Sequence, residues 1–217
     1  SHWLQTHLEM AATCAADGVL GPVIPQVPPQ APAWIHRGRF FEYGGGVDGR
    51  PVPPSAMWVN NALLSAEMVR AEPGPFDARF GLTGGEDSDL MSRLAARGRR
   101  IIWSDQAYVT GPVEARRLNL RWILLRALSG GQDYATLWSQ GRFGTLHAGS
   151  HVLFFLRSLL QMTAAAGLAL MLLPAGRHHC VAWLRKAAAN AGKISALFGW
   201  RYREYGAVAP VRSDADS

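Results

Sequence analysis

Cysteine is scarce in this chain. Cys14 and Cys180 are its two cysteines among 217 residues, and they lie far apart in the sequence. Two such cysteines cannot by themselves build a disulfide framework or a zinc knuckle, and this usage fits a reducing cytosolic environment. Charged residues are also few, at 18%, whereas hydrophobic residues reach 48%. This balance excludes disorder for most of the chain and predicts a packed core.

Acidic residues are few in the second half of the chain. Residues 110–217 contain thirteen Lys/Arg and five Asp/Glu, whereas residues 1–109 contain nine and eleven. The basic half also holds the long apolar stretches, which favours an anionic membrane surface or a phosphate-bearing ligand as a partner. No nucleic-acid-binding motif is present, and the arginines stand among Leu, Ile and Trp rather than on a polar face. We therefore expect no nucleic-acid partner.

The chain also lacks an initiator methionine and a signal peptide. It opens at Ser1-His2-Trp3-Leu4, where the pattern already predicts the start of a helix. We therefore expect this chain to be a piece of a longer protein.

The apolar runs in residues 1–109 predict helices that alternate with strands, which is typical of an α/β layered domain. We expect Trp3, Leu4, Leu8 and Ala11 to share the buried face of the first helix and Pro25 to end the first strand. The predicted helices are residues 3–16, 63–69 and the stretch after Asp87 to about 97. In the last of these, Leu90, Met91, Leu94 and Ala95 are expected to face inward and Gly98 to stand at the C-terminal end. The predicted strands are residues 19–24, 56–59, 101–103 and 107–109.

Residues 25–55 are rich in proline and glycine and predict a long loop. A loop of this length inside a compact domain is usually functional or mobile. It holds more aromatic residues than a bare linker needs, and Trp34 and Tyr43 are candidates for stacking on a sugar.

The C-terminal half predicts long helices. Residues 117–139 are amphipathic, and two further helices, at 151–173 and 180–198, are separated by Pro174-Ala175-Gly176. About sixteen apolar residues from Ser158 fall short of the ~20 that span a bilayer, and extension back to Val152 includes Arg157. The sequence is compatible both with a helix that spans the membrane and with a re-entrant or interfacial hairpin. We expect an α/β domain at 1–140, an apolar helical membrane-associated hairpin at 141–206 and a disordered tail at 207–217.

The sharpest local pattern is Thr83-Gly84-Gly85-Glu86-Asp87-Ser88-Asp89. Three carboxylates in four residues repel one another, and the first turn of a helix compensates them because its N–H groups and dipole favour negative charge. The two glycines allow a ligand to approach the backbone closely. A structural alternative is that Thr83 and Glu86 form a capping box.

At this segment the chain resembles family 2 glycosyltransferases, because Phe76-Asp77 through Asp89 is similar to the stretch that carries their Glu-Asp catalytic pair. The similarity covers roughly residues 3–135 and is closest to the branch that makes bacterial exopolysaccharides, including succinoglycan-type enzymes. The other matching stretches, in order, are Asp17 to Pro25, Pro32-x-Trp34, Asn60-Asn61, Gly98 to Ile102, and Arg117 through Trp122 to Arg126.

The resemblance implies a GT-A fold, of which this chain would be the C-terminal, acceptor-side part. Such enzymes take a sugar from a nucleotide-sugar and transfer it with inversion to a glycan or a lipid-linked acceptor, at the cytosolic face of the inner membrane. Asp87 matches the general base, which must be ionised and close to the acceptor hydroxyl. Glu86 would bind or orient the acceptor, and Gly84, Gly85 and Asn61 would contribute to substrate binding.

A second group of site candidates is Arg117, Arg121 and Trp122, with Arg126 one turn further on. By resemblance they lie near the diphosphate and the acceptor, where guanidinium groups bind phosphate and the indole stacks on a sugar. Leu118 stands where the processive synthases of the family carry Gln, so that version of the motif is incomplete. The alternative is a basic amphipathic helix on a membrane surface, and the two are compatible.

The metal-binding motif of the family, D-x-D, is missing from the expected place. In the family it precedes a Trp-Leu helix start, which here is Trp3-Leu4. We therefore expect the Mg or Mn ligands to lie outside this chain, and no transfer activity without about 100 further residues, half a domain of ordinary size. The alternative function is a non-catalytic, membrane-associated module that binds glycan or lipid-linked sugar.

Overall fold

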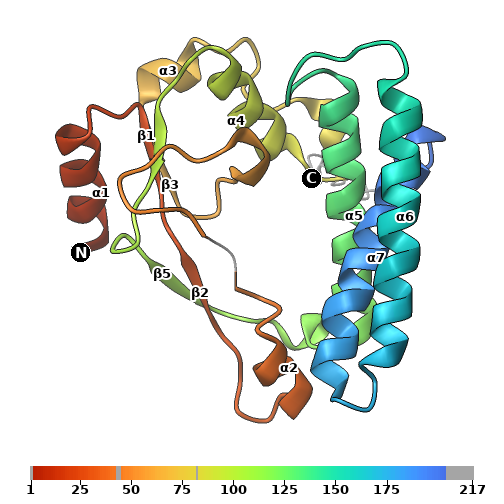
Figure 1. The fold of residues 1–217 in the computed structure, drawn as a ribbon. Helices are drawn as coiled ribbons and strands as arrows, with labels where there is room; N and C mark the ends of the chain where they lie inside the picture. The colour runs from red at the N-terminus through yellow and green to blue at the C-terminus, as the bar shows by residue number, and fades with distance from the viewer. Residues whose placement is uncertain (1, 43–44, 82, 204–217) are drawn as a thin grey trace, which may run out of the picture.

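The computed structural model describes residues 2–42, 45–81 and 83–203. An α/β part lies beside a layer of three long helices (Figure 1). The predicted tail at 207–217 and the candidate Tyr43 lie outside the described residues. The α/β part contains α1 (His2–Thr13), β1 (Gly18–Leu20), β2 (Val23–Gln26), α2 (Ala33–Gly38), η1 (Pro54–Ala56), β3 (Ala62–Leu64), α3 (Ala66–Arg70), η2 (Ala78–Phe80), α4 (Glu86–Ala96), β4 (Ile101–Trp103) and β5 (Val109–Pro112). The connection η3 (Ala115–Arg117) leads to α5 (Leu120–Ser139), α6 (Ser150–Met171) and α7 (Arg177–Leu197).

Strand β1 is the centre of a three-stranded sheet. It pairs antiparallel with β3 and parallel with β4, so that Val19 lies opposite both Leu63 and Ile102. A separate pair, β2 and β5, runs parallel. The prediction that Pro25 ends a strand is wrong, because Pro25 lies inside β2. That strand pairs with β5 alone, so the missing N–H of proline can face the unpaired edge.

The segment between β2 and α4 also differs from its prediction. Residues 56–59 do not form a strand, since Pro53 and Pro54 lead into the short helix η1 and the strand falls later, at β3. The predicted helix at 63–69 begins at Ala66, because the Ser65 hydroxyl accepts a hydrogen bond from the Met68 amide and caps α3. Both errors come from apolar runs too short to distinguish strand from helix.

The core of the α/β part lies between the sheet and α4. The predicted inward face of α4 is confirmed for Leu90, Met91 and Leu94, each at most 1% exposed, and Gly98 follows the helix with a φ of +74°. The buried residues of this core are Leu20, Val52, Met57, Met68, Leu90, Met91, Leu94, Ile101 and Trp103.

The predicted buried face of α1 is wrong. Leu4 and Leu8 are 43% and 54% exposed, whereas Thr6 and His7 are buried. Helix α1 is instead attached by polar contacts, since the Trp3 indole N–H donates to Asn61 Oδ1 at 2.8 Å and His7 Nε2 lies 3.2 Å from the same oxygen. Burial lowers the pKa of His7 below its usual range, which keeps the buried imidazole neutral.

In the helical layer α7 packs against both α5 and α6, and Figure 1 shows the three helices side by side. Helices α5 and α7 approach closely at glycines: a Cβ on Gly131 would lie 1.9 Å from the Ala189 carbonyl oxygen, and one on Gly192 would lie 2.0 Å from that of Leu128. The predicted helices at 117–139, 151–173 and 180–198 are thereby confirmed with shifts of a few residues. Helix α5 packs with this layer, although the predicted boundary at residue 140 separates it from α6 and α7.

A second hydrophobic cluster joins the loop around α2 to the helical layer. It places the part of the proline-rich loop from Val27 to Phe41 against α5 and α7, so this part of the loop belongs to the packed structure. The mixed α/β fold with an apolar helix is confirmed, while its GT-A type stays a prediction. The buried members of the cluster are Ile35, Phe40, Phe41, Ile123 and Val181.

Candidate active site

The glycine pair shapes the start of α4. Gly84 and Gly85 have φ values of +79° and +98°, a conformation that residues with a side chain rarely adopt. Gly85 is the residue before the helix, and no side chain caps it. The capping-box prediction is therefore wrong: the Thr83 hydroxyl interacts with the carbonyls of Phe80 and Gly84, not with the first turn of α4. The first turn carries Glu86, Asp87 and Asp89, as predicted.

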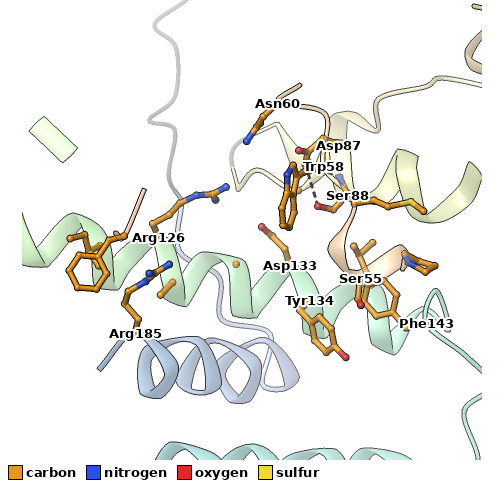
Figure 2. Close-up of a pocket in the computed structure, with 18 of the residues that line it drawn as sticks. Ser55, Trp58, Asn60, Asp87, Ser88, Arg126, Asp133, Tyr134, Phe143 and Arg185 are labelled. Atoms are coloured by element: carbon orange, nitrogen blue, oxygen red, sulfur yellow. Dashed lines mark hydrogen bonds between the residues drawn. The ribbon is translucent and has the colours of Figure 1, made fainter. Parts of the chain in front are cut away.

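Asp87 lines a cavity of about 270 Å³ between the α/β part and the helical layer. Its Oδ1 accepts a hydrogen bond of 2.7 Å from the Ser88 amide, and the side chain is half-buried. The cavity walls come from the loop after Pro53, the start of α4, the inner face of α5 and one residue of α7 (Figure 2). The lining residues that carry polar or aromatic groups are Phe40, Ser55, Trp58, Asn60, Asp87, Ser88, Trp122, Arg126, Asp133, Tyr134, Phe143 and Arg185.

Charges of both signs line this cavity. Asp87 comes from α4 and Asp133 from α5, while Arg126 and Arg185 come from α5 and α7. In Figure 2 the two arginines lie together on one side of the two carboxylates. Trp58 lies next to Asp87 in the same view. The cavity therefore offers carboxylates for a proton, guanidinium groups for an anion and aromatic rings for a flat apolar surface.

Asp133 is a cavity residue that the sequence analysis did not single out. It is 8% exposed and accepts a hydrogen bond of 2.6 Å from Arg201. Burial raises the pKa of Asp133 to about 7 and the charge of Asp87 adds to the rise, although Arg201 and Arg126 act in the opposite direction. A signal in the sequence existed: Asp133 is the single acidic residue between Glu114 and Glu204, within an otherwise apolar and basic stretch.

The structure brings three of the predicted site residues to the cavity: Gly85, Asp87 and Trp122. Gly84 and Glu86 flank them in the chain without lining it. Asn61 is 3% exposed and lies away from the cavity, where its amide donates to the carbonyls of Pro22 and Ala107. Its neighbour Asn60 lines the cavity instead.

The remaining predicted site residues lie beside the cavity. Arg117 binds Glu114 at 2.7 Å and its guanidinium stands 5.5 Å from the centre of the Trp122 ring. Arg121 is exposed on the outer side of α5. Trp34 packs against Phe40 and under the Arg177 guanidinium, so it stabilises the second hydrophobic cluster.

The described residues do not gather a metal site. Within 2–42, 45–81 and 83–203, His, Cys, Asp and Glu side chains nowhere form a group of three or more that could hold a metal ion. The two cavity carboxylates have no third ligand, and Asp133 is already paired with Arg201. A divalent metal does not fit the side chains of the described residues.

The chain is similar to the succinoglycan biosynthesis protein ExoM of Rhizobium meliloti (strain 1021). The two are 31% identical over 212 residues, which cover 94% of this chain and 64% of ExoM. The chain thus spans less than two thirds of the length of its relative. No protein-family model and no solved structure matches the chain.

Proposed function

We propose that this chain is the acceptor-side part of an inverting, family 2 glycosyltransferase that acts in the synthesis of a bacterial exopolysaccharide. Its substrates would be a nucleotide-sugar donor and a glycan or lipid-linked acceptor. The observation that carries the proposal is the position of Asp87. It lines the cavity and follows Gly85, a residue with positive φ, by two positions in the sequence. The relative named for succinoglycan biosynthesis supports the same process.

The chemistry follows from the charges in the cavity. The acceptor hydroxyl would give its proton to the Asp87 carboxylate, and its oxygen would form the new bond to the anomeric carbon of the donor sugar. The bond from that carbon to the diphosphate oxygen breaks, and its electron pair leaves with the nucleoside diphosphate. Arg126 and Arg185 are placed to stabilise this developing negative charge. Trp58 offers an aromatic ring on which a sugar ring would stack, whereas Trp122, stacked on Phe41, would form part of the cavity wall.

We further propose that the protein works at the cytosolic face of the inner membrane, with α6 lying on the bilayer surface. Among the described residues, α6 is the single helix long and apolar enough to cross a membrane by length and composition. It faces α7 through small buried residues, Ser158, Ala165 and Ala169. Its outer side exposes large apolar residues, namely Val152, Leu153, Leu156, Leu159, Leu160, Leu170 and Met171.

The packing of α6 against α7 favours a position on the membrane surface over one in which α6 crosses the membrane. Helix α7 packs along α6 and carries Arg185, Lys186 and Lys193 in its middle. A spanning α6 would take these cations into the hydrocarbon region, at a cost of about 3 kcal/mol or more for each one. An interfacial α6 leaves them in the aqueous and headgroup region, where cations are attracted to anionic lipids.

The experiment that tests the function uses the full-length protein. Asp87→Asn is expected to lower sugar transfer by about 100-fold or more, the usual contribution of a general base, with acceptor binding unchanged. Glu67→Gln is the matched control, because Glu67 is also an acid in the first turn of a helix, exposed and on α3. Undiminished transfer by Asp87→Asn would exclude the assigned base, and acceptor binding without any transfer by the wild-type protein would favour a non-catalytic binding module.

A further inference from the structure

The chain that follows α7 returns to α5 and is fixed there by hydrogen bonds. The Gln132 amide donates to the Trp200 carbonyl at 3.0 Å, and its oxygen accepts from the Tyr202 amide at 2.9 Å. Arg201, between them, donates to Asp133 at 2.6 Å. Gln132 is 1% exposed, so both ends of its amide are satisfied inside the protein by this segment. The position of Arg201 is therefore determined by the backbone on either side of it.

Asp133 lies directly against Gly85, and Arg201 lies against Phe80, to which the glycine turn is hydrogen-bonded. A Cβ built on Gly85 would lie 2.9 Å from the Asp133 carboxyl carbon, so the backbone at Gly85 rests directly against this carboxylate. The Arg201 guanidinium stands 5.6 Å from the centre of the Phe80 ring, and the Phe80 carbonyl accepts hydrogen bonds from the amides of Thr83 and Gly84. The buried pair thus supports the turn that leads to Asp87.

We propose that Asp133, held by Arg201, is a positioning residue that fixes the start of α4 so that Asp87 points into the cavity. This inference rests on the proposed function, in which Asp87 is the general base. It assigns a role in that reaction to α5 and to the segment after α7, which are distant from Asp87 in the sequence.

The charge of Asp133 depends on the charged groups that face it. These are Arg201 from the segment after α7, Arg126 from α5 itself and Asp87 from α4, with Arg185 of α7 in the same cavity. Because the pKa of Asp133 lies at about 7, this carboxyl changes its charge near neutral pH. Above that pH the ionised Asp133 forms a charge-assisted pair with Arg201, which holds the start of α4 more firmly than the neutral carboxyl does. Transfer should therefore rise with pH through about 7.

The test measures kcat and KM of the full-length protein against pH for the wild type and for Asp133→Asn. Asp133→Asn is expected to lower kcat by about 10-fold or more, with the KM for the acceptor within about 3-fold, since misplaced catalytic groups affect the transition state more than binding. Asp133→Asn should also remove the rise in kcat near pH 7. A purely structural role would lower the thermal unfolding temperature and leave that rise in place, which would overturn the proposal.

A second pair of variants covers the case in which Asp133→Asn does not fold. Arg201→Gln removes a positive charge that lowers the pKa of Asp133, so the rise in kcat should move to higher pH, whereas Arg201→Lys should keep it near that of the wild type. Arg39→Gln is the control, because Arg39 forms an exposed ion pair with Glu42. A rise that stays in place in Arg201→Gln contradicts the proposal. Transfer that does not depend on Asp87 would overturn the function itself and this inference with it.

Discussion

Asn61 and Ala107, 46 positions apart in the sequence, are joined by a hydrogen bond of 2.6 Å from the Asn61 side-chain amide to the Ala107 carbonyl. The same amide donates to the Pro22 carbonyl at 3.1 Å, and its oxygen accepts from the Trp3 indole. One buried side chain thereby connects α1, the turn between β1 and β2, the start of β3 and the loop before β5. The resemblance suggested a substrate contact for Asn61, but its hydrogen-bonding capacity is used within the fold.

Replacement of Asn61 should therefore reduce stability. Asn61→Ala leaves two buried carbonyls without their donor and is expected to lower the free energy of unfolding by about 2–4 kcal/mol. Asn60→Ala is the matched control, since Asn60 is exposed, and its effect should stay below about 1 kcal/mol. Urea denaturation measures both. Equal losses for the two variants would contradict the structural role of Asn61.

Gly85 should tolerate a side chain poorly. Gly85→Ala combines a φ of +98° with a contact of 2.9 Å between the new Cβ and the Asp133 carboxyl group. We expect it to lower the free energy of unfolding by about 2–4 kcal/mol, because backbone strain and overpacking add. Gly98→Ala, at the other end of α4, has a φ of +74° but open space around it, so only about 1 kcal/mol of strain is expected. A larger loss for Gly98→Ala in thermal or urea unfolding would be inconsistent with the packing described for Gly85.

The carboxylate of Glu72 is expected to be essential for the stability of the α/β part. Its side chain is 1% exposed and pairs with Arg93 and with Arg97 at 3.0 Å. Glu72→Gln should lower the free energy of unfolding by about 2–3 kcal/mol, because the mostly buried Arg93 guanidinium keeps only one of its two carboxylate partners, Asp89 at 2.9 Å. The exposed pair of Arg39 and Glu42 offers the comparison: Glu42→Gln should cost less than about 1 kcal/mol. Similar denaturation midpoints for the two variants would argue against a buried network at Glu72.

Asp133 also predicts a pH dependence of stability. Its pKa is raised from an ordinary value of 3.8 to about 7 in the folded chain, so the folded state binds this proton more tightly than the unfolded state. The contribution of Asp133 is fully present below about pH 4 and is lost as the pH rises to about 7. The free energy of unfolding of Asp133→Asn relative to wild type should therefore increase across this window, by at most about 1.4 kcal/mol per pH unit. A difference that stays constant with pH would show that Asp133 is already ionised throughout.

The outer face of α6 predicts binding to membranes. Leu153 and Leu160 lie seven residues apart and are 69% and 70% exposed, so both face away from α7. The double change Leu153→Glu/Leu160→Glu should lower binding to anionic phospholipid vesicles by at least about tenfold, because apolar burial is lost and negative charge is added. Leu8→Glu, at a site on α1 that is 54% exposed, should bind as the wild type does. Co-sedimentation measures all three, and unchanged binding of the double variant would exclude α6 as the contact surface.

Local patterns in the sequence predicted the features that depend on neighbouring residues. The start of α4 after the glycine pair, the apolar face of α4 and the break before α7 follow from backbone freedom, helix dipole and periodicity, which act over one or two turns. These same features predicted that Asp87 and Gly85 belong to a site, and both line the cavity. The assignment of Asp87 as a base stays a prediction, since only transfer measurements test it.

The tertiary structure alone decided which residues the site and the core contain. Asp133, Arg185 and Arg201 meet near Asp87 because α5, α7 and the chain after α7 pack together, and no local signal encodes distances between residues so far apart in sequence. Leu4 and Leu8 of α1 are exposed for the same reason: hydrogen bonds to Asn61, 58 and 54 positions from Trp3 and His7, decide which side of α1 faces the sheet. The sequence by itself determined the start of α4 and the break before α7, whereas the cavity required the packing of segments that only the folded chain brings together.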